Sequence, residues 1–456
     1  MTTPQRNRAL GVIGLATLLV LAVFSMVVTT IAETVRHFHA SASWQTWALG
    51  GMSLGLASAL LPSGALADRL GRRRVFVLSS AGLAAFTALG AAAPSMAVFV
   101  AARILQGAAG AGVLAAGLGL LGNAFPDGRA RTHATGIWAA MLGAGIAVGP
   151  ALGALLARAD GWRSGYWVTA VAAGILAGAA LTLPESRPQG EPRRLDPPGV
   201  LAIVVGMTGV TAGLTSGRTD WTSPTTLVLL AGGVAALAAF AAIERTRREP
   251  MLDLELFRRP LFVASVSGAA ITGLATVGLM SYLATIVEGG LDRSPLAAAG
   301  VLAVWSVTSV LVAWQARRLP ARIHARERLI AGLVASGCGA AALAGLSPGS
   351  SWLHLVPGLI LAGVGSGLAN AALGRLAVES VPHADAALGS GANNTARYLG
   401  AALGIALVSA IVAGGGSSSA GLVGGWNHAA LVAAALNLAG ATAVSASRAL
   451  ALQSAK

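Results

Sequence analysis

The feature that most constrains this chain is a long series of apolar runs. A bilayer core of about 30 Å needs about 20 apolar residues in a helix that rises about 1.5 Å per residue. The 456-residue chain is 55% hydrophobic and only 11% charged. It is therefore predicted to be an all-α polytopic membrane protein with 14 transmembrane helices, near residues 9–33, 45–67, 75–93, 96–124, 133–157, 164–183, 198–216, 225–243, 261–287, 296–316, 329–346, 353–377, 391–413 and 427–447.

The basic residues indicate how these helices are oriented. With a cytoplasmic N-terminus, 23 of the 31 Lys and Arg fall on inner segments, five on outer segments, and three inside helices. Cytoplasmic loops of membrane proteins carry such an excess. We therefore expect a multi-pass protein of a bacterial plasma membrane, with both termini cytoplasmic. The net charge of +14 is assigned to loops at an anionic lipid surface, so no nucleic-acid partner is expected.

The sequence lacks the motifs of soluble enzymes. There is no G-x-x-x-x-G-K-[ST] loop for ATP phosphates and no H-E-x-x-H zinc motif. The single cysteine, Cys338, excludes an intrachain disulfide and is expected to be a small buried hydrophobe. We predict no enzymatic activity, no cofactor and no metal.

The connector after the second apolar run reads G-A-L-A-D-R-L-G-R-R-R over residues 64–74. A basic membrane anchor would need only the arginines, and it leaves the Gly/Asp/Gly framework unexplained. The pattern resembles the loop between the second and third helices of the major facilitator superfamily. That resemblance implies the major facilitator fold and a cytoplasmic latch, formed by Gly64, Asp68, Arg69, Gly71 and Arg72.

Three further segments resemble motifs of one branch of that superfamily, the fourteen-helix drug:proton antiporters of the EmrB/QacA type. They are R-I-L-Q-G-A-A-G at 103–110, G-A-G-I-A-V-G-P-A-L-G at 143–153 and N-N-T-A-R-Y-L-G-A-A-L-G at 393–404. The resemblance implies a secondary transporter that exports small amphipathic or antibiotic-like molecules by proton antiport with alternating access. The expected partners are a small-molecule substrate, protons and the lipid bilayer. The protein is expected to be a monomer.

A weak internal repeat supports two halves. Ile104-Leu-Gln-Gly107 recurs as Ile360-Leu-Ala-Gly363, and Pro126 recurs at the same offset of 256 as Pro382. Duplicated halves are common in transporters. We predict a six-helix half at 1–183, linkers with two inserted transmembrane helices at 184–260, and a second six-helix half at 261–456.

Gly145, Gly149 and Gly153 are spaced by four, so they form a stripe on one helix face where a neighbour can approach closely. Pro150 removes a backbone hydrogen bond. The resemblance implies that these four residues act as a hinge or seal. Ordinary small-residue packing is the alternative.

The candidates for proton coupling are Glu33 and Arg103. A charge inside a membrane normally faces a partner or a cavity. Arg103 lies in the fourth apolar run, and snorkelling to the surface is its alternative role. The family's first-helix Asp is replaced here by Val28. Glu33 is predicted either to pair with Arg103 or to be an exposed interfacial carboxylate.

Five residues are candidates for contact with the substrate: Gln106, Trp305, Asn393, Asn394 and Arg397. Gln106 shares a helix face with Arg103, and the other four lie in the tenth and thirteenth apolar runs. Core packing is the alternative for Trp305. Two other functions stay open for the chain: transport of a specific metabolite with different coupling, and a membrane sensor of the same fold that transports nothing.

Overall fold

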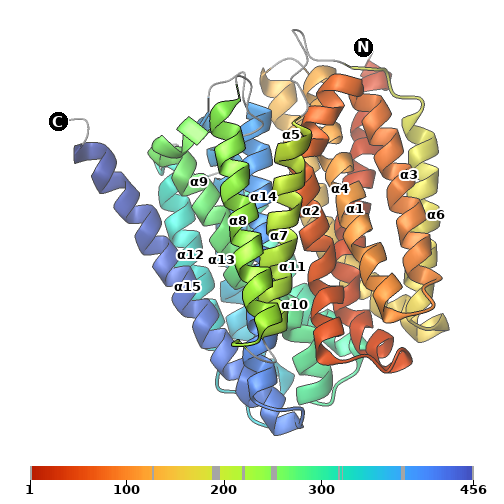
Figure 1. Cartoon of the computed structure of the whole chain (residues 1–456), viewed down its shortest axis with the longest axis vertical. Coiled ribbons are helices and arrows are strands. Elements are labelled where there is room, and N and C mark those ends of the chain that lie inside the picture. The colour runs from red at the N-terminus through yellow and green to blue at the C-terminus, as the bar shows by residue number, and fades with distance from the viewer. Residues whose placement is uncertain are drawn as a thin grey trace. The chain divides into compact units, whose positions relative to one another are not determined.

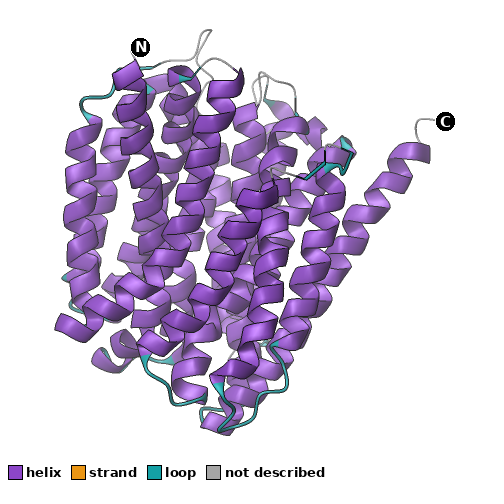
Figure 2. Cartoon of the chain, turned by 180° about the vertical axis from the view of Figure 1, so that it is seen from behind, coloured by secondary structure: helices purple, strands orange, loops and turns teal. Residues whose placement is uncertain are grey.

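The computed structural model describes residues 3–125, 128–186, 196–217, 221–247, 254–316, 319–320, 322–381 and 386–453. Every regular element in these ranges is a helix, as Figure 2 shows. The all-α prediction is confirmed. The chain divides into two compact units, which are described separately below.

The first unit contains six successive helices, and their labels are used in Figure 1. They are α1 (Thr3–His37), α2 (Ala42–Leu70), α3 (Arg72–Ala91), α4 (Met96–Ala124), α5 (Gly128–Asp160) and α6 (Trp162–Ala180).

The second unit consists of Thr211–Leu230 and Asp253–Lys456, and the latter stretch contains first a short 3₁₀ turn, η1 (Leu254–Arg258). Its first helical rod consists of α9 (Pro260–Ile271), η2 (Thr272–Val277), α10 (Gly278–Thr285) and η3 (Ile286–Gly290), of which η2 and η3 are π-helical. We call this rod, residues 260–290, the first rod of the second unit. The remaining elements are α11 (Pro295–Gln315), α12 (Ala325–Ala342), the short η5 (Trp352–His354), α13 (Leu355–Glu379), α14 (Ala386–Gly414) and α15 (Ser419–Gln453).

Two more helices, α7 (Pro197–Gly217) and α8 (Pro224–Thr246), lie between these sets in the chain. The division between the units cuts through both of them. Glycines allow close packing of the pair in the first unit, because a Cβ at Gly233 of α8 would lie 2.5 Å from the backbone nitrogen of Val210 in α7.

A helix stands at each of the fourteen predicted positions in the described ranges, but only twelve are long and apolar enough to cross a membrane. The two that fall short are α6 and α12, which have 19 and 18 residues. Polar first turns explain this result, because α12 begins with Ala325-Arg-Glu-Arg328 and α6 begins with Trp162-Arg-Ser-Gly165. Fourteen crossings therefore stay a prediction.

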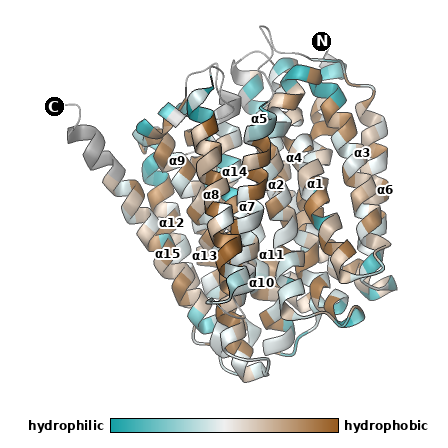
Figure 3. Cartoon of the chain, viewed as in Figure 1, coloured by the Kyte–Doolittle hydropathy of each residue, from teal (hydrophilic) through white to brown (hydrophobic). Residues whose placement is uncertain are grey.

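Apolar residues dominate the middle of the helices, and hydrophilic residues gather at their ends (Figure 3). In lipid no water can bond the backbone, so a spanning segment must satisfy its N–H and C=O groups internally. An α-helix does so, and a chain rich in Ala and Leu forms it readily.

The helices of both units pack in the same order. In the first unit α4 packs against α2 and α3, α5 against α1, and α6 against α1 and α3. In the second, α13 packs against α11 and α12, α14 against the first rod, and α15 against α12 and the first rod. A duplicated six-helix unit would produce this shared order. The predicted division into residues 1–183, 184–260 and 261–456 stays a prediction.

The repeat also has a local counterpart. A Cβ at Gly107 of α4 would overlap the C=O of Met52 in α2, and a Cβ at Gly363 of α13 would lie 2.8 Å from the C=O of Trp305 in α11. The two glycines related by the offset of 256 thus occupy equivalent helix crossings. The two prolines of the predicted repeat, Pro126 and Pro382, lie outside the described residues.

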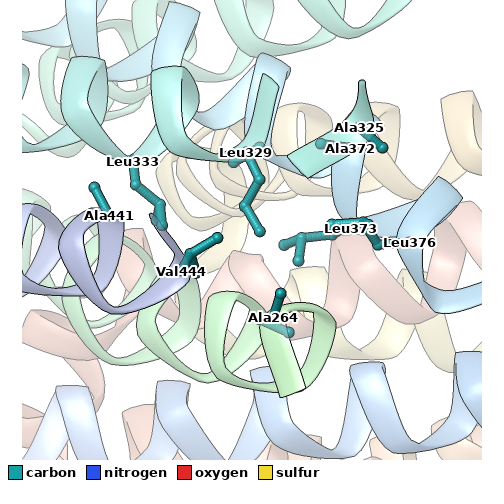
Figure 4. Close-up of a cluster of buried hydrophobic side chains, with 11 residues drawn as sticks. Ala264, Ala325, Leu329, Leu333, Ala372, Leu373, Leu376, Ala441 and Val444 are labelled. Atoms are coloured by element: carbon teal, nitrogen blue, oxygen red, sulfur yellow. The ribbon is translucent and has the colours of Figure 1, made fainter. Parts of the chain in front are cut away.

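A cluster of buried aliphatic side chains forms part of the second unit's core (Figure 4). It joins α9, α12, α13 and α15, and it contains Ala264, Ala269, Ala325, Leu329, Leu333, Ala369, Ala372, Leu373, Leu376, Ala441 and Val444. Cys338 of α12 is exposed, so the prediction that it is buried was wrong.

Candidate functional site

The turn between α2 and α3 is a single residue, Gly71, whose conformation requires glycine. Its φ is +104°, which side chains rarely adopt. The Gly71 N–H donates to the C=O of Ala67 at 3.1 Å and closes the last turn of α2. A Cβ at Gly71 would also lie 2.9 Å from the carboxyl carbon of Glu185. The turn is therefore tight, and it is crowded.

Asp68 and Arg72 form an ion pair across this turn. Asp68 Oδ1 accepts from Arg72 Nε at 3.1 Å and from Nη2 at 3.0 Å. The remaining Nη1 donates to the C=O of Gly119 in α4 at 3.0 Å. The pair therefore joins α2, α3 and α4 within the first unit. Of the other predicted latch residues, Arg69 is exposed, and Gly64 has open space where a side chain would stand.

Glu185 is a second charged group at this turn, and the sequence motifs did not reveal it. Its Oε1 accepts from the N–H of Arg73 and from the N–H of Ser186, both at 3.0 Å. Arg73 Nη1 donates to the C=O of Leu183 at 3.1 Å. A carboxylate is stabilised at a helix N-terminus, here that of α3. The only signal in the sequence was an acidic residue in a stretch that reads as a linker.

The glycine stripe of α5 lies against α1. A Cβ at Gly149 would overlap Ser25 and the C=O of Ala22, and one at Gly153 would lie 2.7 Å from Met26 Cγ. A Cβ at Gly145 would likewise overlap the C=O of Leu18. The two backbones are therefore close enough to exclude any side chain at these positions.

Polar side chains of α1 strengthen this contact. Thr29 Oγ1 donates to the C=O of Pro150 at 2.8 Å, and Ser25 Oγ lies 3.3 Å from the C=O of Gly145. The helix α5 continues through Pro150 without ending. The geometry fits a tight seam between α1 and α5, whereas a hinge role stays a prediction.

Arg103 is fully buried and is held by backbone carbonyls. Its Nη1 donates to the C=O of Val23 at 2.8 Å, its Nη2 to the C=O of Phe24 at 3.1 Å, and its Nε to the C=O of Ala48 at 3.3 Å. These acceptors belong to α1 and α2. Arg103 therefore connects three helices of the first unit, and it does not snorkel to a surface.

Gln106 lies beside Arg103 and is fully buried as well. Its Oε1 accepts from Arg103 Nη1 at 3.1 Å, and its Nε2 donates to the C=O of Phe86 in α3 at 3.3 Å. Both ends of the amide are used between helices. In this structure Gln106 supports packing and does not face an open space.

Glu33 does not contact Arg103, so the predicted ion pair is wrong. Its Oε1 accepts from the N–H of Trp162, the first residue of α6, at 3.3 Å. The acceptors of Arg103 on α1 lie nine or more residues earlier, about 14 Å away along the helix. The partial positive charge of the α6 N-terminus attracts the carboxylate instead. Glu33 is half-buried.

Arg163 stabilises the same end of the first unit. Its Nε donates to the C=O of Ala91 at 2.9 Å and its Nη2 to the C=O of Ala93 at 3.0 Å. Its Nη1 lies 3.0 Å from Nε2 of His37, and the guanidinium carbon lies 4.5 Å from the ring centre of Trp162. Because a guanidinium only donates, Nε2 of His37 is the acceptor. No motif in the sequence marks either side chain.

Two candidates in the second unit have hydrogen bonds between helices. Trp305 of α11 is buried, and its Nε1 donates to Ser366 Oγ of α13 at 3.0 Å. Asn393 of α14 is buried, and its Nδ2 donates to the Oγ and the C=O of Ser265 in α9, at 2.9 and 3.0 Å. For both residues the contacts favour the packing alternative.

Arg397 and Asn394 differ from these residues because both side chains are only half-buried. Asn394 Nδ2 donates to the C=O of Ser390 at 3.0 Å, one turn earlier in α14. The Nε of Arg397 is buried and has no hydrogen-bond partner among the described residues. Near the C-terminal end of α13, Arg375 forms an ion pair with Glu379.

The described residues contain no group of three His, Cys, Asp or Glu side chains that could hold a metal ion.

Comparison with known proteins extends over nearly the whole chain. Residues 13–405 match the Major Facilitator Superfamily. The chain is 30% identical to the puromycin resistance protein pur8 of Streptomyces alboniger over 445 residues, which cover 95% of this chain and 88% of that protein. It is 32% identical to the cephamycin export protein CmcT of Amycolatopsis lactamdurans over 425 residues, which cover 88% of this chain and 84% of that protein.

A solved structure shows the same fold. It is a bacterial homologue of the human lysosomal transporter Spinster, with a TM-score of 0.70 over 98% of both chains at 16% identity. Together with the helical architecture and the match over residues 13–405, these likenesses show that the chain belongs to the Major Facilitator Superfamily of membrane transporters.

Proposed function

We propose that this protein is a secondary transporter that exports small amphipathic, antibiotic-like molecules across a bacterial plasma membrane. The observation that carries the proposal is the likeness, over 88% of this chain or more, to proteins named for puromycin resistance and cephamycin export. Membership of a transporter superfamily also confirms the prediction that the chain is not an enzyme. We place both termini in the cytoplasm, because the arginine distribution favours that orientation.

Proton antiport with alternating access is the mechanism we propose. It requires each six-helix half to move as a body. Three sets of contacts support rigid behaviour of the first unit: the Asp68–Arg72 pair, the α1–α5 seam and the Arg103 hydrogen bonds. In this proposal the α2–α3 turn is the cytoplasmic latch, and the stripe of Gly145, Gly149 and Gly153 with Pro150 seals the half.

The proton-coupling candidates contribute in different ways. Glu33 can bind and release a proton, and it lies at the N-terminus of α6, at the end of α1 opposite the chain's N-terminus. Arg103 is effectively always charged, so it cannot carry the proton itself. We propose that Arg103 holds α1, α2 and α4 in place and that Glu33 is the proton-coupling group. Protonation of Glu33 would weaken its hydrogen bond to Trp162.

The substrate candidates also separate into two groups. The polar groups of Gln106, Trp305 and Asn393 are used between helices, whereas Asn394 and Arg397 keep part of their side chains exposed. We propose that Asn394 and Arg397 contact the transported molecule and that the other three residues shape the helices around it. The protein is proposed to act as a monomer.

Export is tested with puromycin and cefoxitin, a cephamycin. Expression in a drug-sensitive bacterium should raise the concentration of at least one of them that stops growth. In inverted vesicles with an acidified lumen, that compound should release protons, seen as recovery of the fluorescence of a pH-gradient dye. The variant E33Q should abolish proton release. If neither compound changes growth or the gradient, the proposed function is contradicted.

A further inference from the structure

Two buried arginines of this protein have their donors satisfied by backbone carbonyls. Arg103 donates through Nε, Nη1 and Nη2 to carbonyls of α1 and α2. Arg328 of α12 donates in the same way to four backbone carbonyls, those of Ala316, Leu319, Pro320 and Ile323, at 3.1–3.3 Å. Neither guanidinium keeps a free edge for a ligand, so both are structural.

Arg397 differs from both. It lies eight residues inside the candidate span Gly389–Gly414, about 12 Å from its beginning. Its Nε has no hydrogen-bond partner in the described part of the chain, and its guanidinium forms no ion pair there. The residue as a whole is only half-buried, although its Nε is buried.

The described spans of the second unit contain only two carboxylates, and both lie at or near the end of a span. They are Glu288, two residues from the end of Pro260–Gly290, and Glu379, the last residue of Trp352–Glu379. Glu379 is paired with Arg375. A charge at this depth costs about 2.5–3.5 kcal/mol on insertion scales. An arginine that lacks a counter-ion within the protein therefore suits a binding site, in which a bound molecule supplies the counter-ion.

The backbone opposite Arg397 is also irregular. The π-helical η2 packs against α14 at this level, since a Cβ at Gly273 would overlap the C=O of Arg397. Interruptions of this kind occur frequently at functional sites. A guanidinium with no ion pair among the described residues and a π-helical turn thus lie side by side in one unit, and they are independent observations.

We propose that Arg397 binds an anionic group, a carboxylate or sulfonate, of the exported molecule. This inference rests on the proposed function and adds a substrate class to it: amphipathic organic acids. A guanidinium presents two parallel N–H groups to the two oxygens of a carboxylate, which gives both strength and orientation. An amine or a neutral ester offers no such partner.

The test uses two dansyl compounds that differ in charge: dansylglycine, a carboxylate, and its neutral amide. The full-length protein is placed in nanodiscs of neutral lipid and binding is followed by dansyl fluorescence. The wild type should bind the acid about tenfold to hundredfold more tightly than the amide, as expected for a hydrogen-bonded charge pair. R397Q should bind both equally, and R397K should keep part of the preference.

The matched control is R375Q, which removes an exposed arginine from the same unit and should keep the full preference. Retention of the preference in R397Q would overturn the proposal, as would transport of both compounds at equal rates by the wild type. Those outcomes would leave the proposed export function intact. Transport of neither dansyl compound, puromycin nor cefoxitin in proteoliposomes would contradict the export function itself.

Two further measurements distinguish a substrate site at Arg397 from a lipid site and from a purely structural role. Repeating the binding in nanodiscs with phosphatidylglycerol tests a lipid headgroup as the anion. If that lipid weakens dansylglycine binding in the wild type but not in R397Q, the occupant is lipid and the proposal is wrong. The melting temperature of R397Q should equal or exceed that of the wild type, because the Arg397 Nε has no hydrogen-bond partner among the described residues. A fall of several degrees would instead indicate a structural role.

Discussion

At the scale of single residues, the two arginines Arg103 and Arg397 show what surrounds a charge inside a membrane-spanning helix. Arg103 has acceptors for each of its guanidinium nitrogens, and they come from two neighbouring helices. Arg397 has a buried Nε with no acceptor in the described residues. An arginine side chain can therefore either hold helices together or remain available to bind a ligand. Which of the two it does depends on whether backbone carbonyls lie within reach.

Removing Arg103 should destabilise the first unit. In R103Q the shorter amide cannot reach the carbonyls of both α1 and α2, and Gln106 loses a donor. We expect the free energy of unfolding to fall by about 2–3 kcal/mol, since a hydrogen bond from a charged group contributes about 1.5–3 kcal/mol. Thermal unfolding of the purified protein measures this. The control is R69Q, an exposed arginine whose removal should change the melting temperature little.

A second residue-scale prediction concerns the turn between α2 and α3. The variant G71A places a Cβ at a φ of +104° and against the Glu185 carboxyl group. A strained backbone of this kind costs about 1–3 kcal/mol. The melting temperature should fall and export should be reduced. G64A is the matched control, because nothing lies within 4 Å of its Cβ position. Equal effects of the two variants on the melting temperature and on export would show that the turn does not require glycine at position 71.

At the scale of helices, both units join their first and fifth elements through small residues. In the first unit the stripe of α5 contacts α1. In the second, Cβ atoms at Gly400 and Gly404 of α14 would overlap the C=O groups of Ala270 and Leu274 in the first rod. Without a hydrophobic driving force between helices in lipid, such close van der Waals contact is what holds them together.

The seam of the first unit can be opened by one side chain. In G149V the added methyl groups would overlap Ser25 and the C=O of Ala22, so α1 and α5 must separate. Overpacking of this kind costs about 1–3 kcal/mol. Export should be lost, in growth assays and in vesicles. G174V in α6 is the control, since its Cβ position has no neighbour within 4 Å. Normal export by G149V would remove the seam from the mechanism.

At the scale of the whole molecule, the number of crossings is the main question that the helices raise. It is decided by α6 and α12, whose first turns are polar. We predict that both cross. Single cysteines are introduced at Arg74, Asp292 and Ser418, three exposed positions, in a C338S background, because Cys338 is itself exposed.

A membrane-impermeant thiol reagent applied to whole cells should label the cysteines at 292 and 418 but not the one at 74. If α6 does not cross, positions 74 and 292 will lie on the same side. If α12 does not cross, positions 292 and 418 will lie on opposite sides. Each result identifies one helix, so the count is settled without further structural work.

Much of the fold follows from the sequence, because lipid permits few solutions. An apolar run of about 20 residues must be helical, and helices stand at all fourteen predicted positions in the described ranges. The spacing of Gly145, Gly149 and Gly153 also predicted a close contact, which is present. Periodicity and composition carry this information directly.

The candidate site was less predictable. Arg103 bonds to main-chain carbonyls, which no side-chain pattern reveals, and so one of the two alternatives predicted for Glu33, the ion pair with Arg103, was wrong. Trp305 and Asn393 are hydrogen-bonded across helices, which depends on rotation of each helix about its axis. The π-helical turns add further uncertainty, because each one shifts the faces of the residues that follow it.

The turn at Gly71 has a consequence for motion. Two long helices are joined there by one residue, and its backbone N–H and the flanking Asp68–Arg72 pair are already bonded. Such a connection has little conformational freedom. When α2 tilts, we expect α3 to tilt with it as one rigid body. A small rotation at Gly71 then becomes a large displacement at the opposite ends of both helices.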